Sequence, residues 1–152
     1  MTENVLEKIV KNKREKIKLL KQSVSLADIE KKINDQKNFI NFKEKINNNI
    51  KKNKNSLIAE IKKASPSAGI IIEDYKPVDI AKIYMSNNAT CLSVLTEQDF
   101  FLGNLIHISK IKQNVNLPIL CKDFFIDKYQ VPLAKSYGAD AILIILAALS
   151  ES

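Results

Sequence analysis

The sequence has little of two residue types that many active sites depend on. It contains one histidine, His107, and two cysteines, Cys91 and Cys121. His107 lies outside every motif, so a Ser–His–Asp arrangement cannot be argued from it, and we expect a surface or packing residue. Both cysteines lie inside apolar runs, which predicts reduced core residues and neither a disulfide nor a metal site. Cysteines used in this way suit a cytosolic protein.

Long hydrophobic runs are also missing. No apolar run approaches the roughly 20 residues that a membrane-spanning helix needs. Residues 1–16 contain no apolar segment fit for a secretory signal. We therefore expect no membrane partner and a cytoplasmic location. The chain is otherwise ordinary for a globular domain, with 152 residues, 45% hydrophobic and 27% charged.

The positive charge of the chain is unevenly distributed. Residues 1–55 hold 15 Lys and Arg against 7 Asp and Glu, whereas residues 56–152 hold 9 against 10. This contrast predicts two units, an N-terminal helical extension over 1–55 and a main domain over 56–152. Acids are scattered among the lysines of the extension, and it lacks the aromatic interleaving that stacks bases. We expect a solvated helical surface and no nucleic-acid partner.

Hydrophobic spacing changes near residue 57. The extension shows helical spacing over residues 4–21, 25–35 and 38–50. Beyond it, four apolar segments read as strands: residues 57–61, 91–97, 117–125 and a part of 139–149. Three segments between them read as helices: residues 76–88, 103–115 and 127–138. Alternating strands and helices predict a parallel sheet, and strands that are apolar nearly throughout are covered on both faces.

Charged and polar residues close three successive strands. They are Glu60 with Lys62, Thr96 with Glu97, and Lys122 with Asp123. Positions two apart on a strand share a face, so Glu60 and Lys62 point the same way. Active sites of α/β proteins lie at the carboxyl ends of the strands. The pattern predicts a site for proton transfer on an anionic substrate, and a structural ion pair stays open as the alternative.

Four segments resemble the indole-3-glycerol phosphate synthase family of tryptophan biosynthesis. They are "IAEIKKASPSAG", "SVLTEQDFFLG", "LPILCKDFFIDKYQ" and "GADAILIILAAL", and they follow one another in the family's order between Leu57 and Leu149. The resemblance implies an α/β fold of the (β/α)8 TIM-barrel family, preceded by a helical extension. It also implies a carbon-carbon lyase (a carboxy-lyase) that uses no cofactor and no metal.

The resemblance assigns roles to individual residues. In this family 1-(2-carboxyphenylamino)-1-deoxyribulose 5-phosphate undergoes ring closure, decarboxylation and dehydration to indole-3-glycerol phosphate. Lys122 resembles the general acid of ring closure, and Glu60 and Lys62 resemble a pair that contacts substrate and assists proton transfers. The residues that resemble substrate-binding positions are Ser65, Glu97, Phe101, Phe124 and Leu143. Phe101 and Phe124 would be walls around the anthranilate ring, although ordinary core positions stay open for both.

The chain is short for a complete barrel. A (β/α)8 barrel needs about 250 residues, and after the extension this chain supplies about four βα units. We expect a truncated barrel that is inactive alone and that can associate through its exposed sheet edges. Three other functions remain open: another phosphate-binding barrel such as phosphoribosylanthranilate isomerase or a Schiff-base aldolase using Lys122, a basic binding module, and a self-associating half-barrel without catalysis.

Overall fold

The extension forms three helices, as the helical spacing predicts. The computed structural model describes residues 4–36 and 38–149, and its first helices are α1 (Val5–Ser23), α2 (Leu26–Asn34) and α3 (Phe42–Lys51). A polar side chain caps the N-terminus of each, and these caps are Asn4, Ser25 and Asn41. Such side chains accept hydrogen bonds from the free N–H groups of the first turn and so set where each helix begins.

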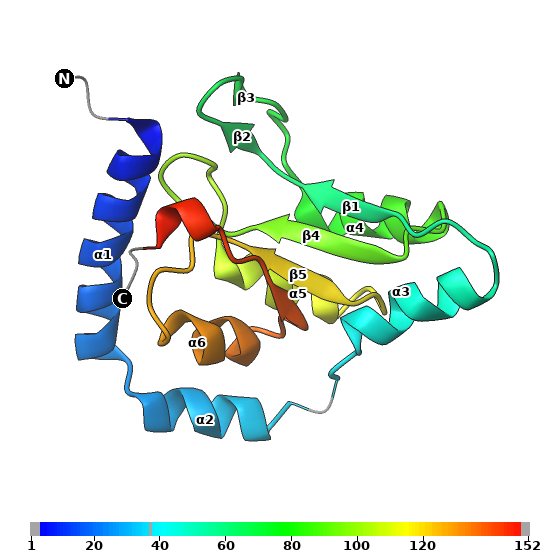
Figure 1. Cartoon of the computed structure of the whole chain (residues 1–152), viewed down its shortest axis with the longest axis horizontal. Coiled ribbons are helices and arrows are strands. Elements are labelled where there is room, and N and C mark those ends of the chain that lie inside the picture. The colour runs from blue at the N-terminus through cyan, green and yellow to red at the C-terminus, as the bar shows by residue number, and fades with distance from the viewer. Residues whose placement is uncertain (1–3, 37, 150–152) are drawn as a thin grey trace.

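A four-stranded parallel sheet forms the centre of the molecule (Figure 1). Its order is β1 (Ile58–Ile61), β4 (Cys91–Leu95), β5 (Ile119–Lys122) and β6 (Ala141–Ile142). The helices that connect these strands are α4 (Pro77–Ser86), α5 (Leu105–Lys112) and α6 (Gln130–Ser136). Four strands, each paired in parallel with the next and joined through helices, make a partial α/β barrel, which confirms the predicted fold class.

Three details of the chain differ from the expectation. A hairpin of β2 (Ala64–Ser65) and β3 (Gly69–Ile70) follows β1, where we expected only a loop. The second strand ends at Leu95, two residues before the predicted end. The third strand ends at Lys122, three residues before the predicted end. The last strand lies within residues 139–149 as expected, is two residues long, and is followed by a 3-10 turn, η1 (Leu146–Ala148). Strands this short contain too few residues to show a period.

Two apolar clusters hold the elements together. The larger cluster lies between the sheet and the helices that follow its strands, with Ile61, Val94 and Ile119 fully buried at its centre. The smaller cluster contains Ile17 of α1, Ile29 of α2, and Tyr129 and Leu133 at α6. The extension is therefore packed on the outer side of α6 by its own apolar contacts.

Both ends of the sheet are tied to the extension. Figure 1 shows α1 beside the carboxyl ends of the strands and α3 near their amino ends. At the amino ends, Asp140 accepts hydrogen bonds from the backbone N–H groups of Ile40 (2.8 Å) and Ile119 (2.7 Å). Lys112 Nζ lies 2.5 Å from the same carboxylate, whose side chain is only 1% exposed. No helix among the described residues is long and apolar enough to cross a membrane.

Candidate active site

Glu60 lies between two lysines at the carboxyl ends of the strands. The Glu60 cluster consists of Glu60 on β1, Lys62, which is the first residue after β1, and Lys122 at the end of β5. Lys62 Nζ is 2.6 Å from Glu60 Oε1, and Lys122 Nζ donates a hydrogen bond to Glu60 Oε2. Strand β4 separates β1 from β5, so Lys122 reaches across a whole strand to make this contact. The two ammonium groups therefore share one carboxylate on one face of the sheet.

The register of the sheet explains how the cluster assembles. Glu60 pairs with Ser93 of β4, and Lys122 pairs with Leu95 of the same strand. Paired residues of neighbouring parallel strands point to the same face, and so do residues two apart on one strand. Glu60, Ser93 and Lys122 consequently share a face, and the small Ser93 side chain leaves room for the longer ones to meet.

Partial exposure shapes the electrostatics of the cluster. Its side chains are 30% to 36% exposed, which leaves them accessible to a small molecule. Partial burial acts to raise the pKa of Glu60, but hydrogen bonds and charge from Lys122 and Lys62 outweigh it and hold this pKa below its usual value. Glu60 is thus a carboxylate at neutral pH, and the cluster carries two ammonium groups on one anion.

Two aromatic rings stand in the loops beside the cluster. Phe101 belongs to the loop after β4 and Phe124 to the loop after β5, and their ring centroids are 6.2 Å apart with planes inclined by 40°. Both rings are partly buried. This spacing falls within the 4.5–7 Å range at which aromatic pairs attract each other.

Glu97 is directed into its own loop. It is 2% exposed, and its carboxylate accepts hydrogen bonds from the backbone N–H groups of Asp99 (3.1 Å), Phe100 (2.7 Å) and Phe101 (3.1 Å). Gly103 closes the same loop by donating its N–H to Glu97 O at 2.7 Å. The contacts of Glu97 thus shape the loop that carries Phe101, and the structure does not bring its carboxylate to the Glu60 cluster.

Ser65 and Leu143 lie at two further strand ends. Ser65 ends β2, and its Oγ accepts a hydrogen bond from the backbone N–H of Ala68 at 3.2 Å. Leu143 follows β6, is partly buried, and donates its backbone N–H to Cys121 O at 3.3 Å. The one histidine, His107, is half-buried on α5 with its ring edge-on to Tyr75, 5.5 Å between centroids.

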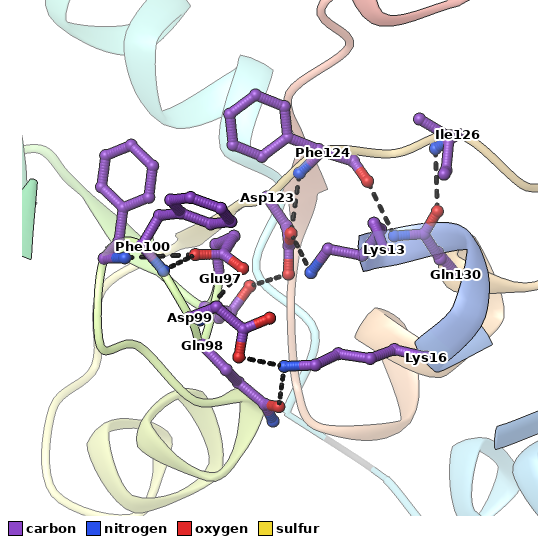
Figure 2. Close-up of polar contacts among 12 residues, drawn as sticks. Lys13, Lys16, Glu97, Gln98, Asp99, Phe100, Asp123, Phe124, Ile126 and Gln130 are labelled. Carbon is purple, nitrogen blue, oxygen red and sulfur yellow. Dashed lines mark hydrogen bonds and ion pairs between the residues drawn. The ribbon is translucent and has the colours of Figure 1, made fainter. Parts of the chain in front are cut away.

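Two lysines of the extension that the sequence did not single out contact the loops after β4 and β5 from the side of α1. Figure 2 shows Lys13 reaching Asp123, at 2.6 Å, and Lys16 reaching Asp99, also at 2.6 Å. A signal for Lys13 was present, because it falls midway between Ile9 and Ile17 on the buried face of α1. A lysine on an apolar helix face requires a buried carboxylate partner.

A partly open cavity of about 60 Å³ lies beneath α1, between this helix and the loops after β4 and β5. Its lining includes Ile17 and Leu20 from α1, and Thr96, Phe125 and Leu133 from the barrel. Neither Glu60 nor Lys122 lines it. The Glu60 cluster is thus a separate, open site on the other side of the strand ends.

Comparison with known proteins identifies the kind of barrel. The family model described as "Indole-3-glycerol phosphate synthase" matches residues 6–152. Curated proteins of the same name are 45% identical over 148 residues in Trichodesmium erythraeum and 45% over 147 in Alkaliphilus metalliredigens. Each alignment covers 97% of this chain but only 49% and 55% of those relatives. The chain spans about half the length of the curated relatives it matches.

Proposed function

Because the chain belongs to the indole-3-glycerol phosphate synthase family, we propose that it supplies half of a site that forms indole-3-glycerol phosphate. The substrate would be 1-(2-carboxyphenylamino)-1-deoxyribulose 5-phosphate, and carbon dioxide and water would leave. The observation that carries this proposal is the Glu60 cluster, in which two ammonium groups meet on one carboxylate. Such a cluster can attract an anionic substrate and also move protons.

Lys122 is the proposed general acid of ring closure. An aryl carbon of the substrate attacks the carbonyl carbon, and the carbonyl oxygen takes a proton from the Lys122 ammonium group as the C–C bond forms. Before substrate binds, the carboxylate of Glu60 holds this ammonium group in place. The substrate carboxylate then leaves as carbon dioxide.

Glu60 and Lys62 are proposed to complete the proton transfers. Loss of the new hydroxyl group as water requires a proton for the leaving oxygen and a base for the proton lost from the ring. The ion pair of Lys62 with Glu60, 2.6 Å long, places a donor and an acceptor side by side for this dehydration. No cofactor is needed for any of these steps.

The remaining predicted residues are proposed to shape the substrate pocket. Phe101 and Phe124, which lie close enough to contact each other, would together line one wall of the pocket for the anthranilate ring. Ser65 and Leu143 would line the same pocket from two other strand ends. Glu97 is proposed to act on substrate binding indirectly. Its carboxylate accepts a hydrogen bond from the backbone N–H of Phe101 and so helps to fix the loop that carries this ring.

The phosphate group is the part of the substrate that these residues leave unsupported. In barrels of this kind, backbone N–H groups of late loops and a helix N-terminus bind phosphate. We therefore propose that this chain needs a further four βα units and has little or no activity alone. Within residues 4–36 and 38–149, no strand pairs with the outer edges of β1 and β6, where such units could join. A cytoplasmic location is proposed with it, because both cysteines are buried and free.

Reconstitution tests the proposal. The chain would be mixed with a separately produced C-terminal half of the Trichodesmium erythraeum relative, assembly would be followed by sedimentation, and indole-3-glycerol phosphate formation would be assayed. We expect activity from the assembly, none from either half, and none from an assembly with Lys122→Met. An assembled but inactive barrel, or an active isolated chain, would contradict the proposal.

A further inference from the structure

A buried ion pair joins helix α1 to the strand end that carries Lys122. Lys13 Nζ lies 2.6 Å from Asp123 Oδ1, and the two side chains are only 9% and 10% exposed. Removing two charges from water costs free energy that their mutual attraction often does not fully offset. A gain in stability is therefore a weak explanation for the presence of this buried ion pair. The position of Asp123, next to Lys122, supplies one.

Asp123 connects three parts of the structure through one carboxylate. Besides Lys13, it accepts a hydrogen bond from Thr96 Oγ1 at 2.8 Å and one from the backbone N–H of Phe124 at 2.7 Å (Figure 2). The backbone N–H of Thr96 in turn donates to Lys122 O at 3.1 Å. The helix, the end of β4 and the loop after β5 therefore meet at this side chain.

Strand alternation places Lys122 and Asp123 on opposite sides of the sheet. Neighbouring residues of a strand point to opposite faces. Lys122 accordingly contacts Glu60, whereas Asp123 turns toward α1 and contacts Lys13. Among the described residues, no hydrogen bond or ion pair joins Lys13 to the Glu60 cluster, so its structural connection to Lys122 is the neighbouring residue Asp123.

We propose that Lys13 is a positioning residue for Lys122 and Phe124. By holding Asp123, it fixes the end of β5 and the first peptide of the following loop, so that the ammonium group and the aromatic ring keep one orientation. The inference rests on the proposed function, because Lys122 is the proton donor there. A displacement of about 1 Å at such a group can cost about a hundredfold in rate.

Hydrogen exchange on the chain itself tests the structural half of this inference. Lys13→Met removes the ammonium group and keeps most of the side chain, and Lys18→Met makes the same change on the exposed face of α1. We expect the Phe124 amide, which donates to Asp123, to exchange at least tenfold faster in Lys13→Met than in Lys18→Met. The Ile119 amide, at the other end of β5, should not change. Equal acceleration at both amides, or none at Phe124, would overturn the inference.

Kinetics of the reconstituted barrel test the functional half. Lys13→Met should lower kcat about tenfold, because the Lys122 ammonium group is displaced, and should also raise KM, because the Phe124 ring that would contact the substrate is displaced with it. Lys13→Arg should restore most of kcat, and Lys18→Met should not change it. A merely structural role would instead reduce the concentration of active sites, measured by titration with a tight-binding inhibitor, and leave kcat per site unchanged.

The outcomes separate this inference from the proposed function. An assembly of unsubstituted chain that forms no product would overturn the proposed function, and with it the role of Lys13 in that reaction. An active unsubstituted assembly beside a Lys13→Met assembly with the same kcat per site would overturn the positioning role alone.

Discussion

Glu60 is the residue on which the candidate site depends. Its carboxylate is the common partner of Lys62 and Lys122, which come from two strands that are not neighbours in the sheet. Without it, two ammonium groups would face each other across β4 and repel. The same carboxylate thus neutralises part of the charge and determines where both lysines point.

The titration of Glu60 can be measured directly by carbon-detected NMR. Its pKa should lie below the ordinary value of 4.5, because the two lysines outweigh partial burial. In Lys122→Met we expect this pKa to rise, since burial then acts against a single lysine. Because the pKa of Glu60 is lower in the folded chain than in the unfolded chain, its ionisation stabilises the fold at pH values above the ordinary glutamate pKa. This contribution is lost as the pH falls through the folded-state pKa. An unchanged pKa in Lys122→Met would contradict the shared-carboxylate geometry.

Gly103 is a second residue with a specific requirement. A Cβ built there would overlap the backbone oxygen of Leu95, so the loop after β4 can approach the strand only without a side chain. Gly103→Ala should therefore lower the free energy of unfolding by about 1–3 kcal/mol, because the obstructing atom belongs to the backbone. Urea unfolding would measure the loss.

Gly69→Ala is the comparison for that variant. At Gly69 a Cβ meets nothing within 4 Å, and only its φ of +65° disfavours alanine. We expect a loss of about 1 kcal/mol there. A larger loss at Gly69 than at Gly103 would show that the contact with Leu95 is not the limiting one.

The meeting of side chains at the strand ends could be predicted from the sequence, whereas their roles in a site stay a prediction. Glu60, Lys62 and Lys122 follow from strand periodicity, and the structure brings them together. The direction of Glu97 could not be predicted, because a carboxylate at a strand end can face substrate or its own loop, and only the course of the loop decides. The burial of Lys13 could have been predicted from its position between Ile9 and Ile17, but we expected it to be one of many solvated lysines.

At the scale of elements, the charge contrast between the two units has a structural explanation. Lys13, Lys16 and Lys21 of α1 form ion pairs with carboxylates of the barrel loops, namely Asp123, Asp99 and Asp127. The latter two pairs are exposed and worth about 0–1 kcal/mol each. These exposed ion pairs determine the orientation of α1 more than they stabilise its packing. The apolar cluster around Ile17 and Ile29 provides most of the free energy that holds α1 and α2 against the barrel.

The opposite end of the extension depends on Asp140. Its nearly buried carboxylate joins the segment after α2 to the beginning of β5, with Lys112 as its counter-ion. Asp140→Ala would leave the Lys112 charge and two N–H groups without their partner, and should lower the free energy of unfolding by about 3 kcal/mol.

Asp140→Asn is the matched variant for this prediction. Asparagine keeps one acceptor oxygen and removes the charge, so the free energy of unfolding of Asp140→Asn should lie between that of the unsubstituted chain and that of Asp140→Ala. Hydrogen exchange at the Ile40 and Ile119 amides, which donate to Asp140, would locate the effect. Faster exchange spread evenly over the sheet would contradict a local tie.

Helices were easier to predict from sequence than the short strands. The spacing of apolar residues indicated α2 and α4, which begin with the N-cap Ser25 and with Pro77 in the first turn respectively. The hairpin of β2 and β3 was missed because each strand has two residues, held partly by Ile71 and Ile72 donating to Lys63 O. A strand within residues 139–149 was predicted and β6 lies there, but apolar composition alone did not show where in that segment the strand ends and the 3-10 turn η1 begins.

At the scale of the whole molecule, the sheet is open on both sides. Strands β1 and β6 each have one unpaired edge, and large apolar side chains near them are exposed: Leu57, Ile58, Ile144 and Leu146. Unpaired parallel edges with apolar neighbours favour association. We therefore propose that the chain alone self-associates, and that added C-terminal βα units compete with this association.

Sedimentation at several concentrations tests this proposal. The average mass should rise with concentration and return toward the monomer in Leu146→Glu, because Leu146 is 80% exposed beside the β6 edge. Leu19→Glu, on the exposed face of α1, is the control and should not change the mass. A monomer at all concentrations would contradict the proposal.

The alternation at Lys122 and Asp123 has a consequence for protein engineering. Adjacent residues there form ion pairs on opposite sides of the sheet, and we propose a chemical task for one and an anchoring task for the other. A graft of this N-terminal helix onto a different barrel would have to bring the aspartate and its threonine neighbour along. Helix α1, the end of β5 and the following loop would therefore have to be exchanged together. Exchanging only one of them would leave Lys13 or Asp123 buried without its charged partner.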